Sequence, residues 1–287
     1  MPRHAKRDEL LPDEAVPLST TTTTATTTVV TVTLLPALAE LLRTAADPAL
    51  TEDFALALLK RADLPAEVLE QLGRNVSALK SRKVKIALAG HAHTPRHVSV
   101  PLARQFYTFD LMRLALFPVV PADVKVAVDS LLISRLKMVT VGERLTLARR
   151  ASGRVAAALL RDPAGGVRGK TVEAKPRSAR AVSAGAEPRE LRVMQTALDN
   201  PRLTEALVIN SVLRPDASAE LVHAVARHAK WSRRKEIRAA LLRTEHLSLA
   251  RALEFSEEIP GPVLQELLNS SRLPAKIKDQ LTRERLA

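Results

Sequence analysis

The stretch that decides the fold runs from Glu187 to Leu253 and reads EPRELRVMQTALDNPRLTEALVINSVLRPDASAELVHAVARHAKWSRRKEIRAALLRTEHLSLARAL. One phrase occurs in it three times: a short basic lead, a helical run that ends in Ala-Leu or Ala-Val, and then a residue that breaks helices. The three copies begin at Ala197, Ala224 and Ala240, and earlier copies begin at Ala87, Ala115 and Ala158. Recurrence of this kind is typical of a repeat protein.

The spacing of the phrase predicts the length of the repeat. Ala115 to Ala158 spans 43 residues, as does Ala197 to Ala240. The interval from Ala87 to Ala197 equals two such steps if 24 residues are removed. Residues 164–187 supply a stretch of that length without apolar periodicity. A helical unit of this size cannot bury its apolar stripe alone, so the units must stack. We therefore predict an all-α fold, an α-solenoid of stacked short helix pairs.

The composition agrees with many small helix contacts. Of 287 residues, 46% are hydrophobic but only 2% are aromatic, so a core must be filled by Leu, Val, Ala and Ile. Cysteine is absent, which excludes disulfides, thiolate metal sites and cysteine nucleophiles and favours a reducing compartment. No apolar run reaches the ~20 residues that a membrane-spanning helix needs. The formal charge of +13 predicts attraction to anionic partners.

Two segments do not share the helical pattern. Residues 1–33 contain the run STTTTTATTTVVTVT and are expected to form a low-complexity, Thr-rich, disordered tail. Residues 34–287 are expected to form one α-helical repeat domain, because apolar residues recur there at spacings of three and four. A flexible basic loop at 164–187 is expected to interrupt this domain.

Several phrases resemble a known class of repeats. VKIALAGHAHTPRHV, VMQTALDNPRLTEALV and IRAALLRTEHLSLARAL are similar to HEAT-like repeats and to the leucine-rich repeat variant, and PADVKVAV (Pro121 to Val128) is similar to the step that opens a HEAT unit. The resemblance covers about Thr51 to Leu281. It implies an α-solenoid that acts as a scaffold, with a minority of such proteins binding nucleic acid. The iron–sulfur cluster known beside leucine-rich repeat variants requires cysteines, which this chain lacks.

Basic residues precede several copies of the phrase. They are Arg82, Lys83, Lys85, Arg149, Arg150, Arg154, Arg189, Arg192, Arg233, Arg234, Lys235 and Arg238. Cations in the first turn of a helix oppose the helix dipole at a cost of ~0.3–1 kcal/mol each at low salt, so helix stability does not explain them. Stacked repeats would align them into an interrupted positive ridge along one edge.

The expected centre of this ridge is the segment RHAKWSRRKEIR, Arg227 to Arg238. Within it, Trp231 either stacks on a base or anchors a partner, or else packs against the next repeat beside a solvated edge. The candidate residues for binding a partner or an anion are Arg82, Lys83, Lys85, Arg150, Arg154, Arg192, Arg227, Lys230, Trp231, Arg233, Arg234, Lys235 and Arg238.

Two other patterns are weaker. Residues Ala164 to Thr171, AGGVRGKT, match a relaxed phosphate-loop pattern, but a repeat helix precedes them and no apolar stripe follows, so we interpret the match as coincidental. His91, His93 and His97 lie close together in the sequence, but no fourth ligand accompanies them, and we expect solvated histidines in a turn rather than a metal site.

No recognisable catalytic constellation occurs, and no cofactor or metal is expected. The sequence favours a non-catalytic, cytoplasmic scaffold that binds another macromolecule, with a protein as the favoured partner and no membrane. The alternative is a nucleic-acid-binding module that uses the basic ridge. A HEAT-like DNA glycosylase, with Trp231 and Tyr107 around a damaged base, is the third and least favoured possibility. The oligomeric state is left open.

Overall fold

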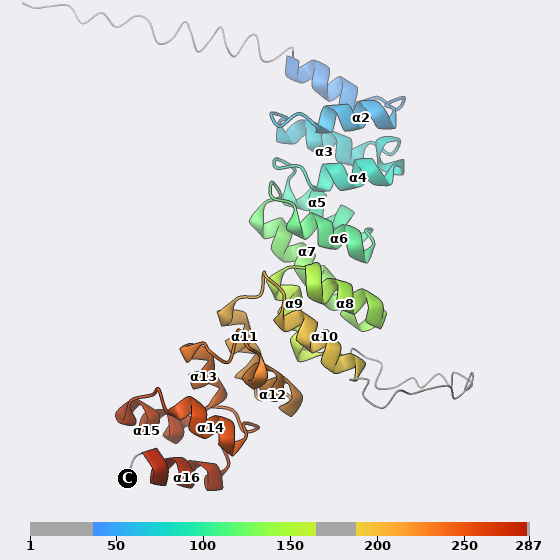
Figure 1. The fold of residues 1–287 in the computed structure, drawn as a ribbon. Helices are drawn as coiled ribbons and strands as arrows, with labels where there is room; N and C mark the ends of the chain where they lie inside the picture. Colours follow the sequence, from blue (N-terminus) through green and yellow to red (C-terminus); the bar gives the residue numbers. More distant parts are fainter. Residues whose placement is uncertain (1–36, 165–187, 286–287) are drawn as a thin grey trace, which may run out of the picture.

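In the computed structural model, residues 37–164 and 188–285 are described, and every regular element in these two ranges is helical (Figure 1). The all-α prediction is confirmed. The tail predicted at 1–33 and all but the first residue of the loop predicted at 164–187 lie outside the described residues.

The helices are short and follow one another in quick succession. A helical segment at residues 37–46 comes first. It is followed by α2 (Glu52–Leu59), α3 (Ala66–Arg74), η1 (Ala78–Lys80), α4 (Arg82–Ala89), α5 (Arg96–Arg104), α6 (Thr108–Leu116), α7 (Ala122–Arg135), η2 (Leu136–Met138), α8 (Val141–Arg150), α9 (Gly153–Arg161), α10 (Arg189–Leu198), α11 (Glu205–Val212), α12 (Ala219–Arg227), α13 (Lys235–Leu241), α14 (Leu249–Ser256), α15 (Gly261–Ser270) and α16 (Ala275–Arg285).

The helices stack in two layers along an elongated body (Figure 1). In one layer α2 packs on α4, α4 on α6, α8 on α10, α10 on α12, and α14 on α16. In the other layer α5 packs on α7, α7 on α9, α9 on α11, and α11 on α13. Across the layers α4 packs on α5, α6 on α7, α8 on α9 and α12 on α13, and the two helices of such a pair run antiparallel (Figure 1). α10 packs directly on α8 and α9, so the stack continues across the gap between the two described ranges.

Helix starts are encoded by short polar side chains and by proline. The hydroxyls of Thr51, Ser81 and Ser218 accept hydrogen bonds from backbone N–H groups of the first turns of α2, α4 and α12. Thr140 and Glu143 form a reciprocal capping box at α8. Such caps satisfy donors that a helix leaves unpaired at its N-terminus. Because residues that start or stop a helix recur at short intervals, helices of about two to four turns are expected.

The core lies between the two layers and is aliphatic, as the composition predicts. Leucines supply most of the large side chains that are fully buried, such as Leu69, Leu88, Leu132 and Leu159. Fully burying a leucine side chain contributes about 1.5–3 kcal/mol. Because each helix contributes only a few such residues, no pair holds a core of its own and every pair depends on its neighbours.

The turns form two edges of the stack. We call front edge the side that carries the turns α2–α3, α4–α5 and so on to α14–α15, and back edge the side that carries the turns α3–α4, α5–α6 and so on to α15–α16. Turns on the same edge are joined by hydrogen bonds. On the front edge Trp231 Nε1 donates to the Leu198 carbonyl at 2.9 Å, and on the back edge Arg135 donates to the carbonyls of Phe106 and Arg104 at 2.5 and 2.6 Å.

The predicted step of 43 residues is wrong, and the structure shows a step of about 30. Within each described range, hydrogen bonds that link neighbouring pairs join residues 28, 30 and 33 positions apart. Those of Asn200 and Arg202, which reach across residues 165–187, join residues 49 to 52 positions apart. Ala115 lies on α6 and Ala158 on α9, in different layers, and Ala197 on α10 and Ala240 on α13 are likewise in different layers. The reason is that every short helix ends in the same kind of phrase, so an interval of 43 counts three helices instead of one pair.

Gly153 shows how closely successive turns meet. A Cβ added there would lie 2.2 Å from the carbonyl oxygen of Arg202 in the α10–α11 turn, whereas a Cβ added at Gly142 would meet nothing within 4 Å. We predict that Gly153→Ala lowers the free energy of unfolding by about 1–3 kcal/mol, because the added methyl overpacks the contact. Gly142→Ala should raise it by about 0.5–1 kcal/mol, because alanine favours the helix. Urea unfolding followed by circular dichroism measures both, and stabilisation by both substitutions would contradict the contact.

Candidate functional site

The predicted cations divide between the two edges. Arg82, Lys83 and Lys85 on α4 and Arg192 on α10 belong to even-numbered helices, whose N-termini lie at the back edge. Arg189, which opens α10, lies at the back edge as well. The N-termini of α9 and α13 lie at the front edge, with Arg149, Arg150, Arg154, Arg233, Arg234, Lys235 and Arg238. The prediction of a single ridge is therefore wrong. The two helices of a pair run antiparallel, so leads that look equivalent in the sequence fall on opposite edges.

The cations at the start of α4 have partners within the protein. Arg82 forms a salt bridge with Asp110 at 2.5 Å, and its guanidinium lies over the Tyr107 ring at 4.9 Å. Lys83 pairs with Glu52 at 3.0 Å. Lys85 Nζ donates to Gln105 Oε1 at 2.9 Å. These contacts join α4 to α2, to α6 and to the α5–α6 turn, so the three cations do not form an open anion-binding site.

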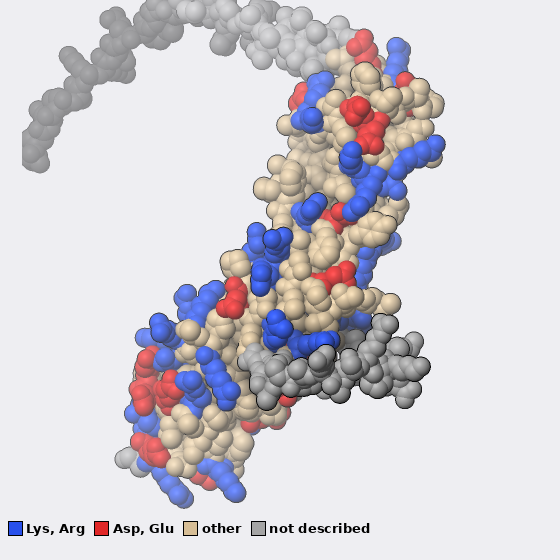
Figure 2. Space-filling view, turned by 45° about the vertical axis from the view of Figure 1, so that its right-hand side comes forward, with Lys and Arg blue, Asp and Glu red and all other residues tan. Residues whose placement is uncertain are grey.

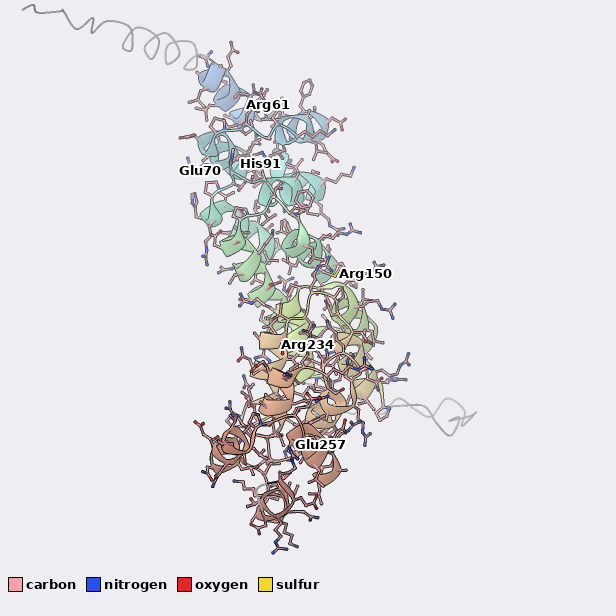
Figure 3. The ribbon with its side chains drawn as sticks, turned by 60° about the vertical axis from the view of Figure 1, so that its left-hand side comes forward. Arg61, Glu70, His91, Arg150, Arg234 and Glu257 are labelled. Atoms are coloured by element: carbon pink, nitrogen blue, oxygen red, sulfur yellow. The ribbon has the colours of Figure 1, made fainter. Side chains whose placement is uncertain are left out.

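Seven cations gather on three successive turns of the front edge, and we call them the front basic cluster. They are Arg150, Arg154, Arg202, Lys230, Arg233, Arg234 and Lys235, and all seven are exposed. Figure 3 shows Arg150 and Arg234 following Arg61 and His91 down the stack. In Figure 2, a different face, positive side chains form separate groups with acidic and uncharged surface between them. On the face shown in Figure 2, positive charge is therefore grouped rather than continuous.

The three turns of the front basic cluster are in direct contact. Asn200 Nδ2, from the α10–α11 turn, donates to the carbonyls of Ala148 and Ala151 at 2.7 and 3.2 Å. Arg202 Nη1 donates to the Arg150 carbonyl at 3.3 Å. His228 Nε2 lies 3.1 Å from Asp199 Oδ1 and joins the third turn to the second. The cations thus stand on a fixed scaffold of hydrogen-bonded backbone.

Part of the positive charge in the cluster is neutralised. Arg234 lies 4.0 Å from the Glu205 carboxylate. The positive charge of Arg154 attracts the Asp129 carboxylate and thereby acts to lower the pKa of Asp129. In the described part of the chain, no ion pair involves Arg150, Arg233 or Lys235. The front basic cluster therefore retains net positive charge toward solvent.

Trp231 is not available to a partner, which corrects its place among the candidate binding residues. Its side chain is 2% exposed, its Nε1 donates to the Leu198 carbonyl at 2.9 Å, and Lys230 Nζ lies 4.0 Å from the ring centroid. A buried ring cannot stack on a base. Of the two interpretations, packing within the stack is the correct one, although the contact is with the preceding pair and not with the next repeat.

Arg238 and Arg227 also differ from the expected surface. Arg238 Nη1 pairs with Glu258 at 2.8 Å, its Nε donates to the Ser232 carbonyl at 2.6 Å, and its side chain is 15% exposed. Arg227 lines a groove of about 520 Å³ between α10 and α12. Arg238 is therefore a structural residue, and Arg227 lies beside the front basic cluster rather than in it.

The three histidines lie on the front edge. The sequence predicts that they are solvated, but His91 is largely buried. His91 is 8% exposed and its Nε2 is 2.8 Å from the Arg61 carbonyl. His93 Nδ1 is 3.0 Å from the Leu64 carbonyl, and His97 is 3.3 Å from Glu70. His91 and His93 therefore join the α4–α5 turn to the α2–α3 turn. Within the described ranges, no group of three or more His, Cys, Asp or Glu is placed to hold a metal.

The alternatives that need a pocket receive no support from the described geometry. Trp231 on the front edge and Tyr107 on the back edge cannot enclose one base. The phosphate-loop match at 164–171 lies, after Ala164, outside the described residues.

Three residues of the front edge were missed by the sequence analysis. Arg202 belongs to the front basic cluster although it does not precede a helix phrase. Phe117 and Val119, in the neighbouring α6–α7 turn, are 53% and 54% exposed. Apolar letters in the segment FPVVP predict burial as readily as exposure, so only the placement of the turn identifies them.

No protein-family model matches the chain, and neither a curated protein nor a solved structure matches it. None of the helices in the described ranges has both the length and the apolar content that crossing a bilayer would require.

Asp129 is a buried carboxyl beneath the front basic cluster. It is 5% exposed and accepts a hydrogen bond from Ser152 Oγ at 2.7 Å, while Ser152 also caps α9. Burial raises the pKa of Asp129 above its usual 3.8, against the opposing effects of the Ser152 hydrogen bond and the Arg154 charge. The folded protein therefore binds this proton more tightly than the unfolded chain does, and ionisation of Asp129 reduces stability as pH rises through its folded pKa.

We predict that the unfolding free energy of the Asp129→Asn variant increases, relative to that of the wild type, as the pH rises from about 3.8 through the raised pKa. The difference in unfolding free energy between the two proteins, measured in urea across this range, should level off near neutral pH. Asp63 is the matched control, because its hydrogen bond to Arg61 lowers its pKa. For Asp63→Asn the difference should move in the opposite direction and at pH below about 3.8, and it should stay nearly level over the range in which the Asp129→Asn difference changes. Parallel curves for the two variants would contradict the prediction.

Proposed function

We propose that the chain is an α-solenoid of the HEAT-like or leucine-rich-repeat-variant kind and serves as a non-catalytic cytoplasmic scaffold. The proposal is supported by the two-layer stack, by the step of about 30 residues between hydrogen-bonded turns, and by the Asn-Pro and Ala-Leu phrases at helix ends. Stacked helix pairs offer extended surfaces, which such proteins use for binding. Absence of cysteine favours the cytoplasm.

The observation that carries the proposed binding role is the front basic cluster on three contiguous turns. Seven exposed cations stand on turns that are hydrogen-bonded to one another, with exposed Phe117 and Val119 on the adjoining turn. Arginine together with large apolar residues is characteristic of protein interfaces, whereas lysine alone is not. A protein partner with an acidic surface and an apolar contact matches this combination.

Nucleic acid is the second candidate, favoured by the formal charge of +13 and by the grouping of arginines. Binding would rest on phosphate contacts, because the buried Trp231 provides no stacking platform. Such binding would be independent of sequence and would weaken steeply with salt. That salt dependence distinguishes it from a protein interface with an apolar contact.

We predict that Arg150→Glu, Arg233→Glu and Lys235→Glu together abolish binding of the partner. These side chains are exposed and outside ion pairs in the described ranges, so the fold should be kept. The control is the same change at Arg189, Arg192 and Lys276, which are exposed at the back edge. A protein that co-purifies stoichiometrically with the wild type should be retained by the back-edge variant and lost by the front-edge variant.

Fluorescence anisotropy with duplex DNA and single-stranded RNA at ~50 mM salt decides between the candidates. Tight binding that the front-edge variant loses, with a salt slope near 0.9 per phosphate contact on duplex DNA, would establish the second candidate instead. Equal retention of the protein partner by both variants would exclude the front basic cluster as its site.

A further inference from the structure

The back edge carries a row of exposed apolar side chains, one in each of three successive turns. Val76 in the α3–α4 turn is 75% exposed, Tyr107 in the α5–α6 turn is 69% exposed, and Met138 in the α7–α8 turn is 88% exposed. They are 31 residues apart in each case, and each follows the end of an odd-numbered helix by two or three residues. We call these three residues the back row. Apolar side chains scattered singly over a surface need no explanation, but a regular interval of 31 residues along one edge sets these three apart.

The turns that carry the back row are fixed to one another. Arg82 joins the first two, because it pairs with Asp110 on α6 and its guanidinium lies over the Tyr107 ring. Arg135 joins the last two, because it donates to the carbonyls of Phe106 and Arg104. The three side chains therefore stand on a rigid base, and a ligand would not have to order the turns when it binds.

The distance between neighbouring members of the row follows from helix packing. Packed helices lie about 8–10 Å apart. Each turn of the back edge is displaced from the turn before it by one such spacing along the stack. A peptide in the polyproline II conformation rises ~3.1 Å per residue with three residues per turn, so every third side chain recurs on one face after about 9 Å. An α-helix returns to one face after ~5.4 Å, or after about 10.8 Å over two turns, and neither value falls within the spacing of about 8–10 Å.

The charges beside the row indicate the polar character of the ligand. Lys80, Arg104 and Lys137 are exposed on these three turns, and within the described ranges none of them forms an ion pair. The acidic side chains nearby are already engaged, Asp110 by Arg82 and Glu143 by the capping box at Thr140. A segment with carboxylates between its apolar residues would complement this surface.

We propose that the back row binds an extended, acidic segment of a partner protein in the polyproline II conformation, with an apolar side chain at every third residue. The apolar side chains contact Val76, Tyr107 and Met138 in turn, and the intervening carboxylates face Lys80, Arg104 and Lys137. This surface is separate from the front basic cluster, so it extends the proposed scaffold function with a second and independent docking site.

The probe is a fluorescein-labelled peptide of Leu-Pro-Glu repeats, about fifteen residues long, in which proline favours the required conformation. A peptide of the same composition in shuffled order is the control ligand. Fluorescence anisotropy compares the wild-type chain with a variant carrying Val76→Ser, Tyr107→Ser and Met138→Ser. The control variant carries Phe117→Ser, Val119→Ser and Val263→Ser, which are 53%, 54% and 52% exposed elsewhere on the surface.

We expect the ordered peptide to bind the wild type, and to bind the back-row variant at least about tenfold more weakly, since each lost side chain removes apolar contact area. The control variant and the front-edge Glu variant should bind it as the wild type does, so loss of the front-edge function leaves this result intact. Met138→Ser alone, at the most exposed position, should weaken binding severalfold and guards against misfolding of the triple variant.

Three results would overturn the proposal: no binding to the wild type, equal binding of the shuffled peptide, or an equal loss in the control variant. The first would show that the row has no affinity for such segments. The second would leave only charge attraction, and the third would place the contact elsewhere.

Discussion

The structure depends on hydrogen bonds that one turn makes to the backbone carbonyls of its neighbour in the stack. Helices of two to four turns are marginal in isolation, and each leaves carbonyls unpaired at its C-terminus. Asn200 and Trp231 supply donors to these carbonyls on the front edge, and Arg135 supplies them on the back edge. Stacking therefore buries the apolar layer and satisfies the helix ends in one step.

This constraint also explains part of the basic composition. Arg144 is 1% exposed, and its guanidinium donates to the carbonyls of Leu136, Val139, Asp162 and Pro163. Burial lowers the pKa of Arg144, yet an arginine remains charged there and binds the carbonyl ends of the surrounding helices favourably. Positive charge thus has two uses in this molecule. Some arginines hold turns together, and those of the front basic cluster remain exposed to solvent.

The sequence predicted the features that are encoded locally. Short helices follow from apolar residues at spacings of three and four, and an aliphatic core follows from the scarcity of aromatic residues. The step of the repeat could not be obtained in this way, because helix ends in both layers carry the same phrase. Nor could the edges be assigned, since they depend on the direction of each helix within its pair.

Single residues show the same division. Trp231 lies in the most basic segment of the chain and is nevertheless buried, because its indole reaches the Leu198 carbonyl of the preceding pair, 33 residues away. Tyr107 lies in an apolar segment and is exposed, because it is the last residue before α6 begins. Composition of the local segment predicts neither outcome. Contacts between pairs decide both.

Hydrogen exchange of the wild type and of Asn200→Ala, followed by mass spectrometry, tests the dependence on these turn contacts most directly. Removing the amide leaves the buried carbonyls of Ala148 and Ala151 without their donor, at a cost of ~1–3 kcal/mol. If each pair is held by its neighbours, protection should fall in α8 to α11 and remain unchanged in α2 to α5. A uniform loss of protection along the whole chain, or none around Asn200, would contradict the account.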